Sequence, residues 1–294
     1  MEFSSNPDRI TRDFFDSLLL ETRYLDSAVP STGVRLFGHD FDTPVMTAAL
    51  SHLHNTTPGG MVIYAQGAAA ANTLHWAGMG SEQELEDILA TGAKTVKIIK
   101  PHADNSIVFS KIEHAVKAGC IAVGMDIDHA FKSDGTPDNV FGLKMAPKSQ
   151  AEIREFVQAA GVPFIVKGVL SPSDAEKCAK AGCAGIVVSH HHGMMPYSLP
   201  PLMALQDILS ATGREMHVFV DCGIESGMDA YKCLALGATA VSVGRHLMPL
   251  LKSGSHAVAA RIREMTAELA GVMARTGVTS VSNMDPTVIH RRTF

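Results

Sequence analysis

Three consecutive histidines, His190, His191 and His192, follow the apolar stretch 185–188. Imidazole near neutral pH serves as a general base or as a metal ligand. In an extended chain neighbouring side chains alternate between two sides, so either His190 and His192 face one way or His191 stands alone. Three hypotheses follow: a base at His191, a structural cluster, or a metal centre that uses His190 and His192 with further donors from His102, His129 or His217. Because these donors lack HExxH-type spacing, we expect no metal.

Polar residues, in one case preceded by a glycine, end apolar runs elsewhere in the chain: Lys100, Asp126, Asp128, Lys167, Ser189, Asp221 and the dipeptide Gly244-Arg245. A charged group that ends a buried strand costs several kcal/mol unless it is paired or meets a ligand. Any one of them could belong to a structural ion pair, but so many endings of this kind predict a shared site. We expect Lys167 to hold an anion or a developing negative charge, or else to pair with Asp128 or Asp221.

Eight short runs rich in β-branched residues predict the strands that carry these endings: 43–50, 73–78, 95–100, 120–128, 163–168, 185–189, 217–221 and 240–244. Helical patterns lie between them, at 81–92, 106–119, 149–161 and 171–182 among others. Nearly continuous apolar strands favour a parallel sheet covered on both faces. Eight strands, each followed by a helix, predict an α/β fold of the (β/α)₈ TIM-barrel class. An open doubly wound sheet is the alternative, although no GxGxxG follows the first strand.

We expect one domain, with an N-terminal helical extension over 1–40, the barrel over 41–275 and a C-terminal tail over 276–294. The extension should contain a helix or two that closes the bottom of the barrel, followed by a ribbon around 37–39. In this fold, the loops after the last two strands usually bind phosphate. Gly223, Gly244 and Arg245 are therefore the predicted phosphate ligands, because glycine lets backbone amides approach and arginine adds a bidentate contact.

The composition excludes several classes of function. The net charge is −5, and positive and negative residues are mixed along the chain. The sequence shows no basic patch that would predict binding to nucleic acid. The chain contains no run of eighteen apolar residues, so we expect no membrane span. The first fifteen residues lack the pattern of a signal peptide. Five cysteines without a CxxC pair indicate reduced thiols and a cytoplasmic location.

The C-terminal half resembles the FMN-dependent α-hydroxy-acid oxidising family, which includes glycolate and lactate oxidases. The resemblance rests on a lysine at the end of the fifth strand and on three further motifs at the spacing of that family: VKGV around Lys167, then SHHHGM, DCGIESG and SVGRH. Weaker matches extend it over most of the chain, including LFGHDFDTPVMTAA in the first strand and MDID at the end of the fourth. The resemblance implies FMN as cofactor, a small-molecule substrate and a homo-oligomer, which is a tetramer by analogy.

Carried over by position, the resemblance implies that His191 is the base that takes the substrate proton while a hydride leaves for flavin N5. Asp128 would orient His191, and Lys167 would face the N1–C2=O edge of the flavin. The remaining cofactor contacts would come from the first strand, from the ends of the fourth and sixth strands and from the phosphate end: Thr47, Ala48, Asp126, Ser189, Asp221, Gly223, Gly244 and Arg245.

Several positions depart from the family pattern. Met194 stands in place of the arginine that grips the substrate carboxylate, and Glu225 replaces an arginine near the expected phosphate. Lys100 and Asp126 replace a tyrosine and a threonine. Lys100 or Lys132 would have to supply the missing contact, or the substrate is larger or less acidic than a simple 2-hydroxy acid, with Met194 as part of an adaptable apolar wall.

Three alternatives to an FMN-dependent oxidoreductase stay open at this point. A flavin-dependent isomerase resembling the type 2 isopentenyl diphosphate isomerases would share the barrel. A non-catalytic barrel that binds phosphate or another ligand would lack flavin. A metal-dependent aldolase or hydrolase would use His190 and His192.

Overall fold

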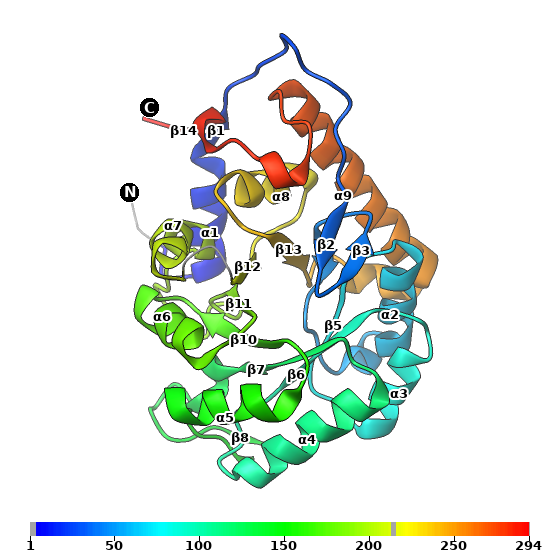
Figure 1. Ribbon diagram of the computed structural model, residues 1–294, viewed down its shortest axis with the longest axis vertical. Helices are drawn as coiled ribbons and strands as arrows, with labels where there is room; N and C mark the ends of the chain where they lie inside the picture. The colour runs from blue at the N-terminus through cyan, green and yellow to red at the C-terminus, as the bar shows by residue number, and fades with distance from the viewer. Residues whose placement is uncertain (1–3, 213–215, 294) are drawn as a thin grey trace.

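The computed structural model describes residues 4–212 and 216–293, and their central element is an eight-stranded parallel barrel (Figure 1). Its strands are β4 (Val45–Thr47), β5 (His75–Ala77), β6 (Thr95–Ile99), β7 (Ala122–Asp126), β10 (Phe164–Val169), β11 (Gly185–Val188), β12 (His217–Val220) and β13 (Ala240–Val243). Each lies within or within one residue of a predicted run. The sequence therefore predicted the (β/α)₈ barrel correctly.

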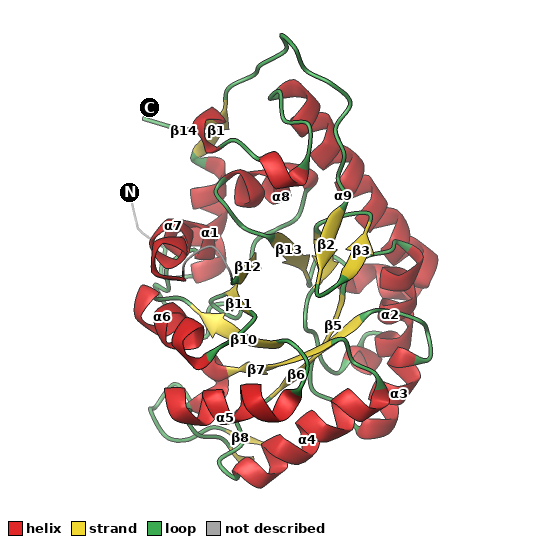
Figure 2. Cartoon of the chain, viewed as in Figure 1, coloured by secondary structure: helices red, strands yellow, loops and turns green. Residues whose placement is uncertain are grey.

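Helices surround the barrel on the outside (Figure 2). They are α2 (Gly60–Ala70), α3 (Glu82–Leu89), α4 (Asn105–Ala118), α5 (Gln150–Ala160), α6 (Pro172–Ala181), α7 (Pro201–Thr212), α8 (Gly227–Ala235) and α9 (Ser255–Arg275). Serine side chains cap several of them: Ser171 accepts a hydrogen bond from the amide of Asp174, and Ser149 with Glu152 forms a complete capping box. Gly119, Gly161 and Gly182 adopt positive φ at helix C-termini, as expected for glycine in that position.

The barrel closes between β4 and β5 through side chains as well as backbone. Seven neighbouring strand pairs form ladders. Among the described residues, β4 and β5 share one isolated bridge, from Leu50 to Ala77, and one backbone hydrogen bond, from the Thr47 amide to the Leu74 carbonyl at 3.3 Å. The Thr73 hydroxyl donates to the Val45 carbonyl at 2.7 Å, and the Trp76 amide donates to the Thr47 hydroxyl at 3.1 Å. Two threonine hydroxyls thus replace missing ladder bonds at the seam.

One hairpin closes the N-terminal end of the barrel. It consists of β2 (Val34–Leu36) and β3 (His39–Phe41), which pair antiparallel around the predicted ribbon. Its buried side chains, Leu36 and Phe41, join the interior cluster that contains Trp76 and Phe219. The hairpin therefore seals the bottom with apolar contacts.

The N-terminal helix α1 (Pro7–Asp16) does not close the bottom, so that expectation is wrong. It packs beside α7 at the opposite end, where its side chains contact the loops after β11, β12 and β13. Polar residues on the helix, Asp8, Thr11 and Arg12, find their partners there. The strand β1 (Leu18–Leu20) follows and pairs with β14 (Ile289–Arg291), so the two ends of the chain are joined.

In the described part of the chain, no helix combines the length and apolar character needed to cross a membrane.

We expect Thr73→Val to weaken the seam, because it removes the donor to the Val45 carbonyl and leaves that buried acceptor unpaired. The free energy of unfolding should fall by about 1–3 kcal/mol, measured as a shift of the urea midpoint by circular dichroism. Thr73→Ser keeps the hydroxyl and is the matched control. Equal stability of Thr73→Val and the wild type would contradict the role of this bond.

Candidate active site

A cavity of about 860 Å³ opens at the C-terminal ends of the barrel strands, a volume in the usual range for cofactor and substrate pockets. Its walls include most of the strand-end residues that the sequence singled out: Lys100, Asp126, Lys167, His191, Asp221, Gly223, Gly244 and Arg245. The barrel thus brings together side chains that lie up to 145 positions apart in sequence, from Lys100 to Arg245.

Asp126, the last residue of β7, lies at the centre of the charged groups. Its Oδ2 is 2.6 Å from Lys100 Nζ, and its Oδ1 is 3.4 Å from Lys167 Nζ. Only 4% of Asp126 is exposed. Burial alone would raise the pKa of this carboxyl, but the two ammonium groups outweigh it and hold the pKa well below its usual value. Asp126 is therefore ionised and gives both lysines a counter-charge.

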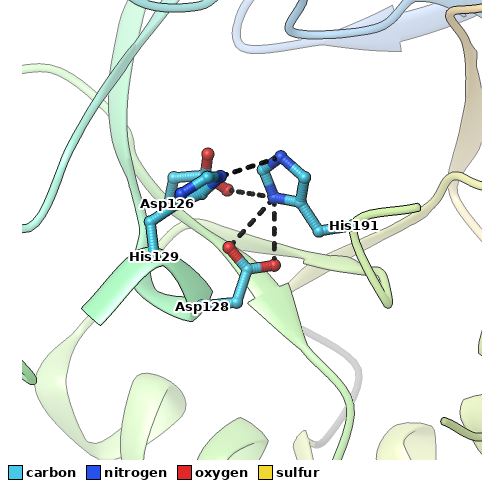
Figure 3. A group of neighbouring side chains, drawn as sticks. All are labelled: Asp126, Asp128, His129 and His191. Atoms are coloured by element: carbon cyan, nitrogen blue, oxygen red, sulfur yellow. Dashed lines mark hydrogen bonds and ion pairs between the residues drawn. The ribbon is translucent and has the colours of Figure 1, made fainter. Parts of the chain in front are cut away.

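His191 lies against two carboxylates (Figure 3). Its Nδ1 is 3.0 and 3.1 Å from the Asp128 oxygens and 3.3 Å from Asp126 Oδ1. Burial and the charge of Lys167 would lower the pKa of His191, but hydrogen bonds to Asp126 and Asp128 outweigh them and raise it to about 9. The ring is thus an imidazolium at neutral pH, and the expected pairing of His191 with Asp128 is present in the geometry.

Lys167 projects from β10 into the same group of charges. Its Nζ lies 3.6 Å from Asp221 Oδ2 as well as near Asp126, and only 5% of the residue is exposed. Burial would lower the pKa of this ammonium, but the carboxylates of Asp126 and Asp221 outweigh it and raise the pKa. A fixed positive charge therefore lies in the wall of the cavity.

The histidine run forms a left-handed turn, so the assumption of an extended chain was wrong. His191, His192 and Gly193 have φ of 47°, 59° and 70°. The turn leaves His190 with structural partners: its Nδ1 accepts from the Gly193 amide at 3.0 Å, so Nε2 carries the proton and donates to Thr11 Oγ1 at 2.8 Å. His190 therefore fixes the loop to α1 and has no free ring nitrogen.

A second histidine lies beside His191. His129, in the 3-10 turn η2 (Ile127–Ala130), has its Nε2 3.1 Å from His191 Nε2. The sequence offered His129 only as a metal donor and gave it no role next to the base. The sequence feature that could have identified His129 as an active-site residue is its position, one residue after Asp128 at a strand end. Active-site residues gather at strand ends in this fold.

The predicted phosphate end contains a contact that the sequence did not show. The Arg245 guanidinium donates to both oxygens of Asp8 on α1, at 2.8 and 2.7 Å. Arg12 on the same helix reaches the Gly223 carbonyl at 3.3 Å. The amide groups of Gly223, Gly244 and Arg245 donate to no protein acceptor among the described residues. Glu225 lines the cavity nearby.

Three predicted cofactor contacts lie differently from the others. Thr47 is fully buried in the β4–β5 seam, where its hydroxyl is 2.9 Å from His75 Nδ1. The Ala48 amide donates to Val243 O and contacts Tyr64 Oη, although Ala48 itself lines the cavity. Ser189 Oγ accepts from the His191 amide at 3.1 Å and so orders the turn. Because β4 ends at Thr47, this part of the cavity wall comes from the residues that follow it, 48–52.

The three residues expected at the substrate are not brought together. Lys100 lines the cavity but is bound to Asp126. Met194 is 41% exposed, Lys132 is also exposed, and neither is among the residues that form the cavity wall. In this structure a carboxylate therefore finds no arginine clamp of the kind that the resemblance implies.

A metal centre at His190 and His192 does not fit the hydrogen bonds of His190. A different group, Asp126, Asp128, His129 and His191, has potential ligand atoms within 4.8 Å of one another. However, Lys100 and Lys167 already neutralise Asp126, and their charges would oppose a divalent cation. The contacts within this group are those of ion pairs and hydrogen bonds.

Comparisons with known proteins agree with this geometry. Residues 7–153 and 143–291 match the model of the FMN-dependent dehydrogenase family. Glycolate oxidase 1 of Zea mays is 25% identical over 93% of this chain and 84% of its own. An L-lactate oxidase of Alicycliphilus denitrificans is 28% identical over 86% of this chain and 79% of its own. A mandelate oxidase variant solved with a monooxide FMN adduct superposes with a TM-score of 0.89 at 26% identity, over 99% of this chain and 92% of that one.

We expect Asp128→Asn to lower the pKa of His191 from about 9 toward 6.5, because a neutral amide stabilises the imidazolium less than a carboxylate does. Titration of the ¹⁵N-labelled imidazole by NMR measures the pKa of His191. Asp134→Asn, in the exposed loop that follows, is the control and should leave the pKa of His191 unchanged. An unchanged pKa in Asp128→Asn would contradict the assigned contact.

Proposed function

The chain belongs to the FMN-dependent dehydrogenase family, and from this premise we propose that it oxidises a 2-hydroxy acid or a close analogue with His191 as base. The observation that carries the proposal is the contact of His191 with Asp128 beside the buried Lys167, on one wall of a cavity large enough for cofactor and substrate. A base oriented by a carboxylate, next to a fixed cation, is suited to removing a hydroxyl proton while a hydride leaves carbon.

The residues present fit FMN. Unpaired amides at Gly223, Gly244 and Arg245 gather at one end of the cavity, where a phosphate would find donors. Lys167 would offer its charge to the flavin ring, and Asp221 could bind the ribityl hydroxyls. The ion pair of Arg245 with Asp8 would have to open or share its guanidinium with the phosphate.

When bound, FMN supplies the acceptor for the hydride, and the protein residues manage the proton and the charges. Because the pKa of His191 is raised to about 9, the ring must first lose a proton before it can accept one from the substrate. The fraction of neutral His191 rises tenfold per pH unit below 9. We therefore expect flavin reduction to accelerate between pH 7 and 9. Asp128 holds the ring in place, and Lys167 balances negative charge that develops in the site.

We further propose a substrate larger or less acidic than glycolate. The arginine clamp is missing, since Met194 and Lys132 lie away from the cavity. A side cavity of about 390 Å³ shares His52, Met79 and Val140 with the main one. Its walls include the exposed ring of Phe141 and could take an apolar or aromatic group.

The isomerase alternative is not favoured, because the two relatives named above are oxidases and the family is that of FMN-dependent dehydrogenases. We also propose that the protein is cytoplasmic and forms a homo-oligomer, which is a tetramer by analogy with the family. Light scattering coupled to size exclusion tests its assembly.

The purified protein should be yellow and should show the absorption bands of bound flavin. Anaerobic addition of members of a 2-hydroxy-acid panel, from glycolate to aryl-substituted acids, should bleach it, and His191→Gln should slow bleaching by about 10²–10⁴-fold. The control is Asp134→Asn. A colourless protein that takes up no FMN, as a non-catalytic barrel would be, or a flavin that no hydroxy acid reduces, would overturn the proposal.

The affinity ratio of FMN to riboflavin isolates the contribution of the phosphate. Arg245→Ala should lower this ratio about 10–100-fold, the equivalent of a charge-assisted hydrogen bond of about 1.5–3 kcal/mol. Asp8→Asn should raise the ratio, because it frees the guanidinium and removes a nearby negative charge. Fluorescence titration of the apoprotein gives both affinities. If Arg245→Ala weakened FMN and riboflavin equally, the arginine would not contact the phosphate.

A further inference from the structure

Both ring nitrogens of His191 are engaged in this structure. Nδ1 lies against Asp128, and Nε2 is 3.1 Å from His129 Nε2 (Figure 3). A base needs a nitrogen with a free lone pair within reach of the proton it removes. The contact with His129 must therefore take part in the way His191 gains and loses protons.

His129 lines the cavity beside His191, and its contacts continue toward a surface loop. Its Nδ1 is 3.4 Å from Asp138 Oδ2, in the loop before β8 (Asn139–Val140). The side chains of His129 and Asp138 are 22% and 20% exposed, so both meet solvent. Asp138, His129 and His191 thus form a continuous series from the loop surface to the cavity wall, and Asp128 contacts the other ring nitrogen of His191.

The positions of the protons follow from the partners. An ionised carboxylate only accepts hydrogen bonds, so Nδ1 of His129 carries a proton. Nδ1 of His191 also carries one, because it lies closer to the Asp128 oxygens, at 3.0 and 3.1 Å, than to the Lys167 ammonium, at 3.3 Å. The two Nε2 atoms can be 3.1 Å apart only with one proton between them. The pair therefore holds three ring protons and one positive charge, in which His191 is the imidazolium and His129 the neutral acceptor.

We propose that His129 is a proton shuttle, which exchanges the Nε2 proton of His191 with solvent through Asp138. This inference rests on the proposed function and adds a positioning and proton-transfer role for a residue outside the expected base and its carboxylate.

His191 first gives its Nε2 proton to His129 Nε2, while the Nδ1 proton of His129 leaves for Asp138 and then water. His129 then turns its Nε2–H away from His191, and the Nε2 of His191 accepts the hydroxyl proton of the substrate as the C–H bond breaks and the C=O double bond forms. Bound FMN would supply the acceptor for the hydride. This proton brings the pair back to three ring protons and one positive charge. His129 returns to its resting tautomer by exchange of ring protons with water through Asp138, so one proton leaves the pair in each turnover.

Charged groups from several elements face the pair. Lys100 after β6, Asp126 on β7, Asp128 in η2 and Asp138 in the loop surround His129, and Lys167 on β10 faces His191. Burial lowers the pKa of His129 first, Lys100 lowers it further, and Asp126 raises it, with a net lowering. His129 is therefore the neutral acceptor that the shuttle needs.

The test uses the FMN-loaded protein, a hydroxy acid that bleaches it, and a pH indicator that records proton release in a single anaerobic turnover. His129→Ala should slow flavin reduction and proton release about 10–100-fold at pH 7. The deficit should shrink as the pH approaches 9, and free imidazole in the buffer should restore the rate in proportion to its concentration. Asp138→Asn should slow proton release, and Asp134→Asn, in the same loop, should not.

A deficit in His129→Ala that is equal at all pH values and insensitive to imidazole would overturn the shuttle and leave a structural role. A second measurement does not depend on turnover. In the wild type, NMR of ¹⁵N-labelled imidazoles should show one strongly deshielded proton coupled to both Nε2 atoms, which is lost in His129→Gln. If no hydroxy acid bleaches the wild type, the proposed function fails, but the NMR signal still tests whether His129 and His191 share a proton. The absence of this signal in the wild type would refute the shared proton.

Discussion

The site depends on one buried carboxylate. Asp126 is 4% exposed and contacts Lys100, Lys167 and His191 at the end of β7. An isolated charge at this depth would cost several kcal/mol, so each of these groups is stable in its ionised form only because the others are present. With Asp128 and Asp221, the carboxylates balance the two ammonium groups and the imidazolium. Removal of any one member would leave an uncompensated charge in the wall of the cavity.

This balance also explains why the barrel mouth can be both ordered and reactive. Lys167 keeps its charge because two carboxylates face it, and His191 keeps a proton because two carboxylates face it as well. The same contacts make the base unavailable until it has lost its proton. The neutral imidazole of His129, 3.1 Å away, can accept that proton while the ion pairs stay intact.

The sequence predicted the barrel because each level of its pattern agreed. Apolar β-branched runs, serine N-caps such as Ser171 and glycine C-caps such as Gly182 all indicate the same order of elements. It predicted the strand-end charges because the fold gathers them at one end. It could not place α1, since the contacts of Asp8 and Arg12 with Arg245 and Gly223 join residues more than 200 positions apart. It assigned Thr47 to the flavin through the family resemblance alone, and the structure shows this side chain buried against His75 at the β4–β5 seam.

The loop residues escaped prediction for a conformational reason. The left-handed turn at His191 and His192 depends on the loop as a whole, including hydrogen bonds that involve Ser189 and Gly193. No periodic pattern in the sequence predicts such a turn. The turn decides which imidazole faces the carboxylates, and hence which of the three histidines can act as base. His190, bound to Thr11, secures the loop to α1.

Neutron diffraction at neutral pH tests the central claim most directly, because it locates the protons on Asp126, His129 and His191. We expect deuterium on both ring nitrogens of His191, a carboxylate without deuterium at Asp126 and no deuterium bonded to His129 Nε2. A neutral His191 or a protonated Asp126 would contradict this claim.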